Sequence, residues 1–171
     1  MADIGAEAGI VGSGIYRHFG SKASILVAML DEVMNRLMSR AAQIIAAAAD
    51  EHQCLSDLVR DHIAVALMDR TILMVYHRES HVLPAEDRRR LRRKQRLYIE
   101  EWAHVLAQLR PDASDATVRA LVHASVGAIQ SVLFYQSGLP DDQLAALMSS
   151  VAETAMFAPL LASPGMTNGL H

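Results

Sequence analysis

The sequence predicts an all-α protein. Apolar residues recur three and four apart through most of its 171 residues, and no segment shows strand-like alternation flanked by Asn-Gly turns. Alanine, leucine and methionine, which favour helices, are abundant. Apolar residues make up 51% of the chain but aromatic residues only 5%. So high an apolar share indicates that another subunit covers part of the surface.

Bulk properties exclude several classes of protein. The net charge of −3 gives no general attraction to nucleic acid, so any DNA affinity must come from a local patch. The single cysteine, Cys54, excludes an internal disulfide and fits a reducing cytosol. The apolar stretch 44–49 is too short to span a bilayer, and no basic leader precedes an apolar run. We therefore expect a cytoplasmic protein without a membrane partner.

The N-terminal segment predicts two short helices joined by a turn. Residues 2–8 favour a helix, and Gly9 permits the left-handed turn that ends it. In the next helix Ile15 and Phe19 lie four apart and can share a buried side. The remaining side chains, with Lys22 beyond, can donate to phosphates and base edges; they are Ser13, Tyr16, Arg17 and His18. This layout is typical of a helix-turn-helix.

The same residues closely resemble the DNA-binding segment of TetR-family transcriptional repressors. The matching residues are Asp3-Ile4-Gly5-Ala6-Glu7-Ala8-Gly9-Ile10-Val11, Ile15-Tyr16, His18-Phe19, Ser21-Lys22 and Ile25-Leu26. The resemblance implies phosphate contacts from Tyr16, His18 and Lys22, and base contacts from Ser13, Gly14 and Arg17. It further implies a homodimer on a palindromic double-stranded DNA operator, and a hydrophobic small-molecule effector bound in a larger helical domain.

Two departures from the family pattern bear on function. Gly12 stands where the family usually has a Ser or Thr cap, which costs a few tenths of a kcal/mol. The family also has a complete helix before the one that contains Ile4, whereas this chain begins at Met1. We therefore expect an incomplete helix-turn-helix, either because Met1 is not the true start or because the protein is a ligand-binding and dimerisation module that has lost DNA binding.

The body follows in order. Ser21 is expected to cap a helix from Lys22 to Ala41 that joins head and body, and Ser114 to cap a later one. Turn and breaker residues bound the remaining predicted helices, at 55–67, 71–80, 84–109, 115–136 and 140–161. The predicted domains are a partial helix-turn-helix with its connecting helix (1–40), a ligand-binding and dimerisation domain (41–163) and a disordered tail (164–171).

Small residues form stripes on the last two predicted helices, and two interpretations stay open. One stripe holds Leu121, Ala124, Ser125, Ala128 and Val132, and the other Leu144, Leu147, Met148, Val151, Ala155 and Ala158. Such stripes suit a four-helix contact between two subunits, or ordinary packing within one. TetR relatives dimerise through their final two long helices, so the resemblance favours the dimer.

Methionine and aromatic residues on three predicted helices suggest an effector pocket. The set is Met68, Leu73, Met74, Tyr76, His77, Tyr98, Trp102, Phe134 and Tyr135. The same residue types build any core, so the cavity is implied by the family fold.

A basic run follows, in which seven of the nine residues Arg88–Arg96 are Arg or Lys. A solvated helix face is the favoured interpretation. The alternative is an entrance that holds the phosphates of a coenzyme A thioester, because the body resembles relatives that sense acyl-CoA.

No catalytic set is evident, so we do not expect an enzyme. His77 and His81 lie four apart like a metal pair, but no third ligand is apparent. Neither a metal nor another cofactor is therefore predicted.

Overall fold

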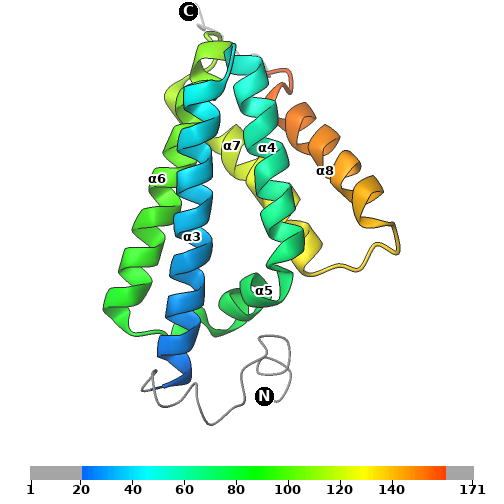
Figure 1. The fold of residues 1–171 in the computed structure, drawn as a ribbon. Coiled ribbons are helices and arrows are strands. Elements are labelled where there is room, and N and C mark those ends of the chain that lie inside the picture. The colour runs from blue at the N-terminus through cyan, green and yellow to red at the C-terminus, as the bar shows by residue number, and fades with distance from the viewer. Residues whose placement is uncertain (1–20, 161–171) are drawn as a thin grey trace, which may run out of the picture.

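The computed structural model describes residues 21–160, which form six α-helices, two 3₁₀ turns and no strand (Figure 1). This confirms the all-α prediction. The helices are α3 (Lys22–Ala47), α4 (Glu51–Met68), α5 (Arg70–Glu79), α6 (Ala85–Leu109), α7 (Asp115–Gln130) and α8 (Asp141–Met156), with the turns η1 (Ser80–Val82) and η2 (Ser131–Leu133).

The long helices α3, α4 and α6 stand side by side, with α3 and α6 running in the same direction (Figure 1). Helix α7 packs against α6, and α8 covers α4 and α7 from outside. The short α5 lies at the end of the molecule where α3 begins, and an ion pair of Arg36 with Asp69 ties this end of α4 to α3. The described residues thus form a helical bundle with α3 along one flank.

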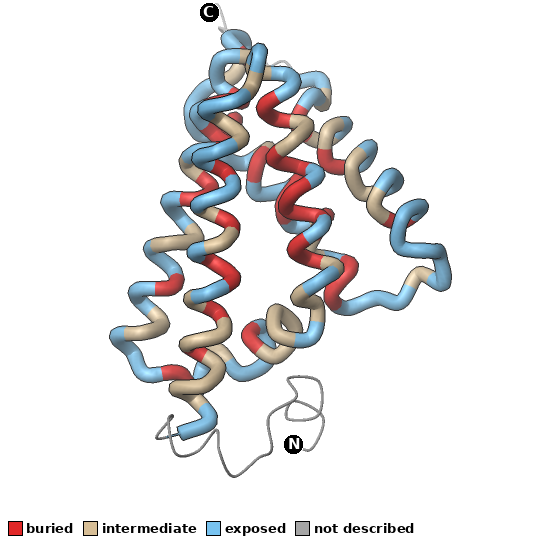
Figure 2. Tube along the Cα trace, in the orientation of Figure 1, coloured by how far each residue is buried: buried red, intermediate tan, exposed pale blue. Residues whose placement is uncertain are grey.

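The core runs along the facing sides of α3, α4, α6 and α7 (Figure 2). Its largest fully buried side chains include Trp102 and Leu106 of α6, Leu58 of α4 and Ile129 of α7. Helix α8 contributes only Leu144, Ala152 and Met156 to the buried set. The hydrophobic effect therefore holds α8 less firmly than the other long helices.

Side-chain caps fix the helix starts. Ser21 accepts a hydrogen bond from the Ser24 backbone N–H at 3.1 Å, and Ser114 accepts one from Thr117 N–H at 3.2 Å, so both predicted caps are confirmed. The predicted start of α4 is wrong. Asp50 accepts from Gln53 N–H at 2.8 Å, and the helix therefore begins at Glu51 rather than Leu55.

Three predicted helix ends are also wrong. Helix α3 continues to Ala47, and beyond Ala41 its Ile44 and Ile45 still pack against the core. Helix α7 ends at Gln130, where the Ser131 hydroxyl donates to the Ala128 carbonyl at 2.6 Å and a 3₁₀ turn follows. Helix α8 stops at Met156, well short of residue 161.

Arg110 explains the end of α8. Its guanidinium is buried at the corner between α6 and α7, and Nη1 donates to the Met156 carbonyl at 2.8 Å and the Ala158 carbonyl at 3.2 Å. Nε donates to the Asp112 carboxylate at 2.9 Å. Carbonyls left unpaired at the end of α8 thus find their donors on another part of the chain.

Candidate functional site

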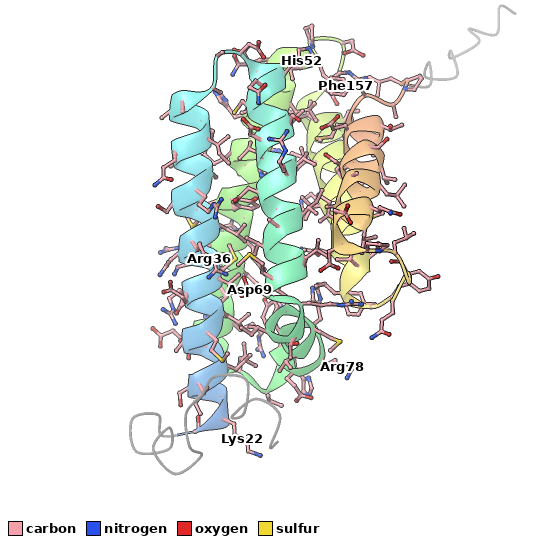
Figure 3. The ribbon with its side chains drawn as sticks, turned by 45° about the vertical axis from the view of Figure 1, so that its right-hand side comes forward. Lys22, Arg36, His52, Asp69, Arg78 and Phe157 are labelled. Atoms are coloured by element: carbon pink, nitrogen blue, oxygen red, sulfur yellow. The ribbon has the colours of Figure 1, made fainter. Side chains whose placement is uncertain are left out.

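The predicted DNA-binding residues lie mostly outside the described part of the chain. Ser13, Gly14, Tyr16, Arg17 and His18 all precede residue 21, as does the predicted helix-turn-helix. The predicted tail, 164–171, lies outside it as well. Lys22 is described: it is the exposed first residue of α3, at one end of the bundle (Figure 3).

The nine predicted effector contacts occupy different environments. Tyr98 and Trp102 of α6 are buried, as is Tyr76 of α5. Leu73 and Met74 are half-buried, and the exposed members are Met68, His77, Phe134 and Tyr135. The structure brings some of them together in two aromatic groups, one in the core and one at the surface.

The core group joins Tyr98 and Trp102 to His62 of α4. The rings of His62 and Tyr98 stack with centroids 5.6 Å apart, and the imidazole Nδ1 lies 3.2 Å from the phenol oxygen. Burial lowers the pKa of His62 to about 4 and raises that of Tyr98, so both are neutral at pH 7. Sequence analysis missed His62, although it follows Leu58 by one helical turn on the buried face of α4.

Two polar atoms of this core group lack partners. Within residues 21–160, neither His62 Nε2 nor Trp102 Nε1 has a hydrogen-bond partner. The Trp102 indole lies edge-on to the Tyr98 ring, with ring centroids 6.0 Å apart. Buried polar atoms without partners are unusual and make this cluster a polar point in an otherwise apolar core.

The surface group lies where α5 meets the turn after α7. His77 and Phe134 pack edge to face with ring centroids 5.2 Å apart, and His77 also touches Tyr76 at 5.9 Å. Arg70 Nη2 donates to the Tyr135 carbonyl at 3.0 Å. Phe134 and Tyr135 stay 60% and 69% exposed, so these rings form a surface patch rather than a pocket wall.

A groove of about 370 Å³ opens between α3 and α6. Apolar residues line most of it, and the set comprises Met38, Ala41, Ala42, Ile45, Ala46, Tyr98 and the carboxylate-bearing Glu101. Of the nine predicted contacts, Tyr98 alone borders this groove. Tyr98 also contacts His62 and Trp102 in the core.

A second hollow of about 360 Å³ lies between the start of α4 and the end of α8. His52 stacks on Phe157 at its edge, with ring centroids 5.5 Å apart (Figure 3). Ser56 donates to the Glu153 carboxylate at 3.1 Å. Its lining is more polar than that of the α3–α6 groove.

The basic run divides into two sides of α6. Lys94 donates to Asp31 and to Asn35 of α3, both at 2.7 Å, and Arg90 pairs with Asp31 at 2.6 Å. Arg89, Arg92, Arg93 and Arg96 are exposed on the outward side, and no carboxylate within residues 21–160 forms an ion pair with them. Part of the run therefore attaches α6 to α3, and the rest is a solvated face.

No three His, Cys, Asp or Glu side chains within residues 21–160 converge as metal ligands would. His81 Nδ1 lies 3.1 Å from the Arg78 carbonyl.

Comparison with known proteins relates this bundle to one family. The model described as "Bacterial regulatory proteins, tetR family" matches residues 1–29. Similar solved structures include a TetR-family transcriptional regulator from Bordetella parapertussis 12822, with 24% identity over 94% of this chain and 86% of that chain and a TM-score of 0.74. The fold is that of TetR-family regulators.

Two further TetR-type structures agree. One is a transcriptional regulator of the TetR/AcrR family from Thermobifida fusca, with 18% identity, coverage of 93% and 86%, and a TM-score of 0.68. The other is the TetR family transcriptional regulator PfmR from Thermus thermophilus, with 14% identity, coverage of 91% and 86%, and a TM-score of 0.72. No curated protein matches the chain in sequence. The resemblance predicted from the N-terminal motif is confirmed.

In this TetR-type fold, the outer sides of α7 and α8 are notably uncharged. Beyond Asp142, the exposed residues of α8 are Gln143, Ala146, Leu147, Ser150, Val151 and Thr154. Beyond Arg119, those of α7 are Ala120, His123, Ala124 and Gly127. We call these ten residues the α7–α8 outer face.

The predicted small-residue stripes only partly coincide with this face. Ser125, Val132 and Leu144 are buried, and the Ser125 hydroxyl donates to the Ala152 carbonyl of α8 at 2.9 Å. These members pack α7 against α8 within one subunit. Ala124, Leu147 and Val151 remain exposed on the outer face.

The stretch Asp115–Leu133, which contains α7, is long and apolar enough to cross a membrane by length and composition. The same test is passed by core helices of water-soluble proteins. Val122 and Ile129 of this stretch are fully buried in the bundle.

Proposed function

We propose that this protein is a TetR-type transcriptional repressor. It binds a palindromic operator as a homodimer in the cytoplasm and leaves the DNA when a hydrophobic small molecule enters its helical body. The observation that carries the proposal is the family match, which runs through the predicted recognition helix and ends at Met29, inside α3. The matched segment is thus continuous with the longest helix of the bundle.

This continuity supports a mechanism. Helix α3 has 26 residues and packs on α4, α5 and α6, so a ligand between these helices changes its tilt. In a homodimer, the tilt of two such helices sets the spacing between two recognition helices. The ligand releases the operator only if it binds more tightly to the conformation with the wrong spacing.

The α7–α8 outer face supports the homodimer. Leu147 is 47% and Val151 39% exposed, and small residues surround them, so two copies can approach closely. Exposure of apolar side chains such as these to water is unfavourable, and a two-fold contact buries them. The same contact accounts for the apolar composition of the stretch Asp115–Leu133 without a membrane.

The direct test is a gel shift of the protein against DNA from its own promoter region. Lys22→Ala and Tyr16→Ala are expected to weaken binding to all sequences and to lower the salt slope by about 1, because each removes a phosphate contact. Arg17→Ala is expected to blur base preference as well. Arg119→Ala, an exposed cation on α7, serves as the control and leaves binding unchanged.

The competing candidate is a ligand-binding and dimerisation module that does not bind DNA. It predicts no shift for this chain, nor for a form extended by any residues encoded upstream of Met1. A gel shift that appears only with the extended form supports the repressor function.

A further inference from the structure

Facing positions of α3 and α6 differ in charge along their interface. At one level a cation of α6 lies between polar side chains of α3, whereas at the groove no cation is present in the lining. At the first level, the Lys94 ammonium of α6 lies between Asp31 and Asn35 of α3, 2.7 Å from each. The two helices run in parallel, so a step of two turns along both leads from one set of facing positions to the next. This step replaces Lys94 by Glu101, and Asp31 and Asn35 by Met38 and Ala42.

The groove confirms that these later positions face one another, because Met38, Ala42 and Glu101 all line it. Here α6 presents a carboxylate and α3 offers no cation in return. No Lys, Arg or His of the described chain forms an ion pair with Glu101. Ala41, Ala42 and Ala46 fill little of the space between the helices, which leaves the volume of about 370 Å³.

Tyr98 adds a second feature that favours a cation. It precedes Glu101 by three residues on α6, so both lie on one side of the helix and both line the groove. An aromatic face attracts a positive charge, and a carboxylate forms charge-assisted hydrogen bonds with an ammonium. The rest of the lining is apolar, and its volume falls in the range of small-molecule sites.

We propose that this groove binds an apolar organic cation, such as a primary or quaternary amine with a hydrocarbon or aromatic body. Its charge lies between the Glu101 carboxylate and the Tyr98 ring, and its body lies on Met38, Ile45 and the alanines. This assignment rests on the proposed function, because it names the chemical class of the effector. It differs in class from the acyl-CoA effector suggested for the basic run, because the lining of this groove contains no cation to hold a phosphate.

The position of the groove links the ligand to α3. A molecule between Met38 of α3 and Glu101 of α6 pushes the later half of α3 away from α6. The earlier half stays attached through Lys94 and Arg90 to Asp31. The helix that continues from the family-matched segment therefore pivots about Asp31.

The test uses three probes with one body and different charges: 4-phenylbutylamine, 4-phenylbutanol and 4-phenylbutyrate. Binding to the full chain without DNA is followed by NMR of methyl-labelled methionine, with Met38 as the reporter. We expect a saturable shift of the Met38 methyl signal and an affinity for the amine at least about ten-fold above that for the carboxylate. Equal affinities, a preference for the carboxylate, or no Met38 shift overturns the proposal.

Neighbouring glutamates supply a matched pair of variants. Glu101→Gln is expected to lower the affinity for the amine about five-fold and to leave that for the alcohol unchanged, since the carboxylate is exposed. Glu100→Gln is the control, because Glu100 pairs with Arg119 at 2.8 Å outside the groove. Ala42→Leu fills the groove and is expected to abolish binding of all three probes. Equal losses in both glutamate variants overturn the assignment of Glu101.

Failure of this inference is distinguishable from failure of the proposed function. If the amine does not bind but the gel shift is intact, the repressor stands and its effector is of another class. If the amine binds as expected but the protein shifts no DNA, the site stands and the chain is a ligand-binding module.

Discussion

At the scale of single residues, His62 shows how burial in the core determines the protonation state of a side chain. The imidazole is buried beside Tyr98 and Trp102, and no cation or carboxylate contacts its Nε2 within the described chain. Desolvation therefore disfavours the charged ring and lowers its pKa to about 4. Burying the neutral ring costs little free energy at pH 7. In acid, however, the His62 ring binds a proton less readily in the folded state than in the unfolded chain.

This predicts a loss of stability in mild acid. Because the folded pKa lies below the unfolded value of 6.5, the unfolded state binds a proton first as the pH falls through 6.5 toward 4. We expect His62 to remove about 2 kcal/mol from the free energy of unfolding between pH 7.5 and 5. Urea unfolding at both pH values measures it.

The control is His62→Leu, which keeps the volume of the ring approximately and cannot titrate. His77 is exposed but partly desolvated, which also lowers its pKa, and it contributes in the same direction in both proteins, so the difference between them isolates His62. Asp61, with a pKa raised by burial, is likewise common to both. A variant with the same pH dependence as the parent contradicts the prediction.

At the scale of elements, the contact of α7 with α8 depends on one small polar residue. Ser125 is fully buried, and its hydroxyl, which has one proton to donate, lies 2.9 Å from the carbonyl oxygens of both Leu121 and Ala152. A hydrogen bond to the backbone of a neighbouring helix requires close approach of the two helices. Helix α8 has few other buried side chains, so this approach matters for its attachment.

Ser125→Leu is therefore expected to destabilise the protein by about 2 kcal/mol, because the larger side chain forces α8 away and leaves the Ala152 carbonyl without this donor. Ala124→Leu, one residue earlier and exposed, is expected to leave the free energy of unfolding of the monomer unchanged. Thermal melts of both variants at low concentration separate the outcomes. Similar losses in the two would show that Ser125 has no special role.

Sequence patterns located the elements well where the signal is local. Ser21 and Ser114 could be predicted as helix caps from the sequence, because each directly precedes a run of apolar residues at helical spacing. Asp50 was missed because an alanine-rich run precedes it and hides the break between α3 and α4. The end of α8 depends on Arg110, which lies 46 residues away from Met156 in the chain, and no local pattern records that contact.

Site residues were harder to predict because residue type does not reveal the environment. Tyr98 and Tyr135 were equivalent candidates, yet one is 3% and the other 69% exposed. Sequence analysis did not single out Glu101, because its role as a candidate ligand contact depends on the small side chain of Ala42, which lines the same groove from α3. Register between helices distant in sequence is a property of packing, which periodicity within one helix cannot supply.

At the scale of the whole molecule, the uncharged α7–α8 outer face predicts the state of association. Leu147→Glu is expected to weaken the proposed homodimer at least about 30-fold, because two carboxylates enter a desolvated contact. Leu97→Glu is the control: Leu97 of α6 is 48% exposed, against 47% for Leu147, and lies outside the face. Sedimentation equilibrium of both variants measures the change. A monomeric parent protein, or equal effects of both variants, contradicts the proposed interface.

The two ends of α8 differ in how they are attached to the rest of the bundle, because Arg110 binds only one of them. The guanidinium anchors the Met156 end to the rest of the bundle, whereas the Asp141 end follows the segment containing Gly138, with a φ of +72°. Helix α8 is about 24 Å long, and the buried side chain in its first turn is Leu144. In Figure 1 the Asp141 end lies at the outer edge of the molecule. We therefore expect the proposed contact between subunits through the α7–α8 outer face to be held more rigidly near Met156 than near Asp141.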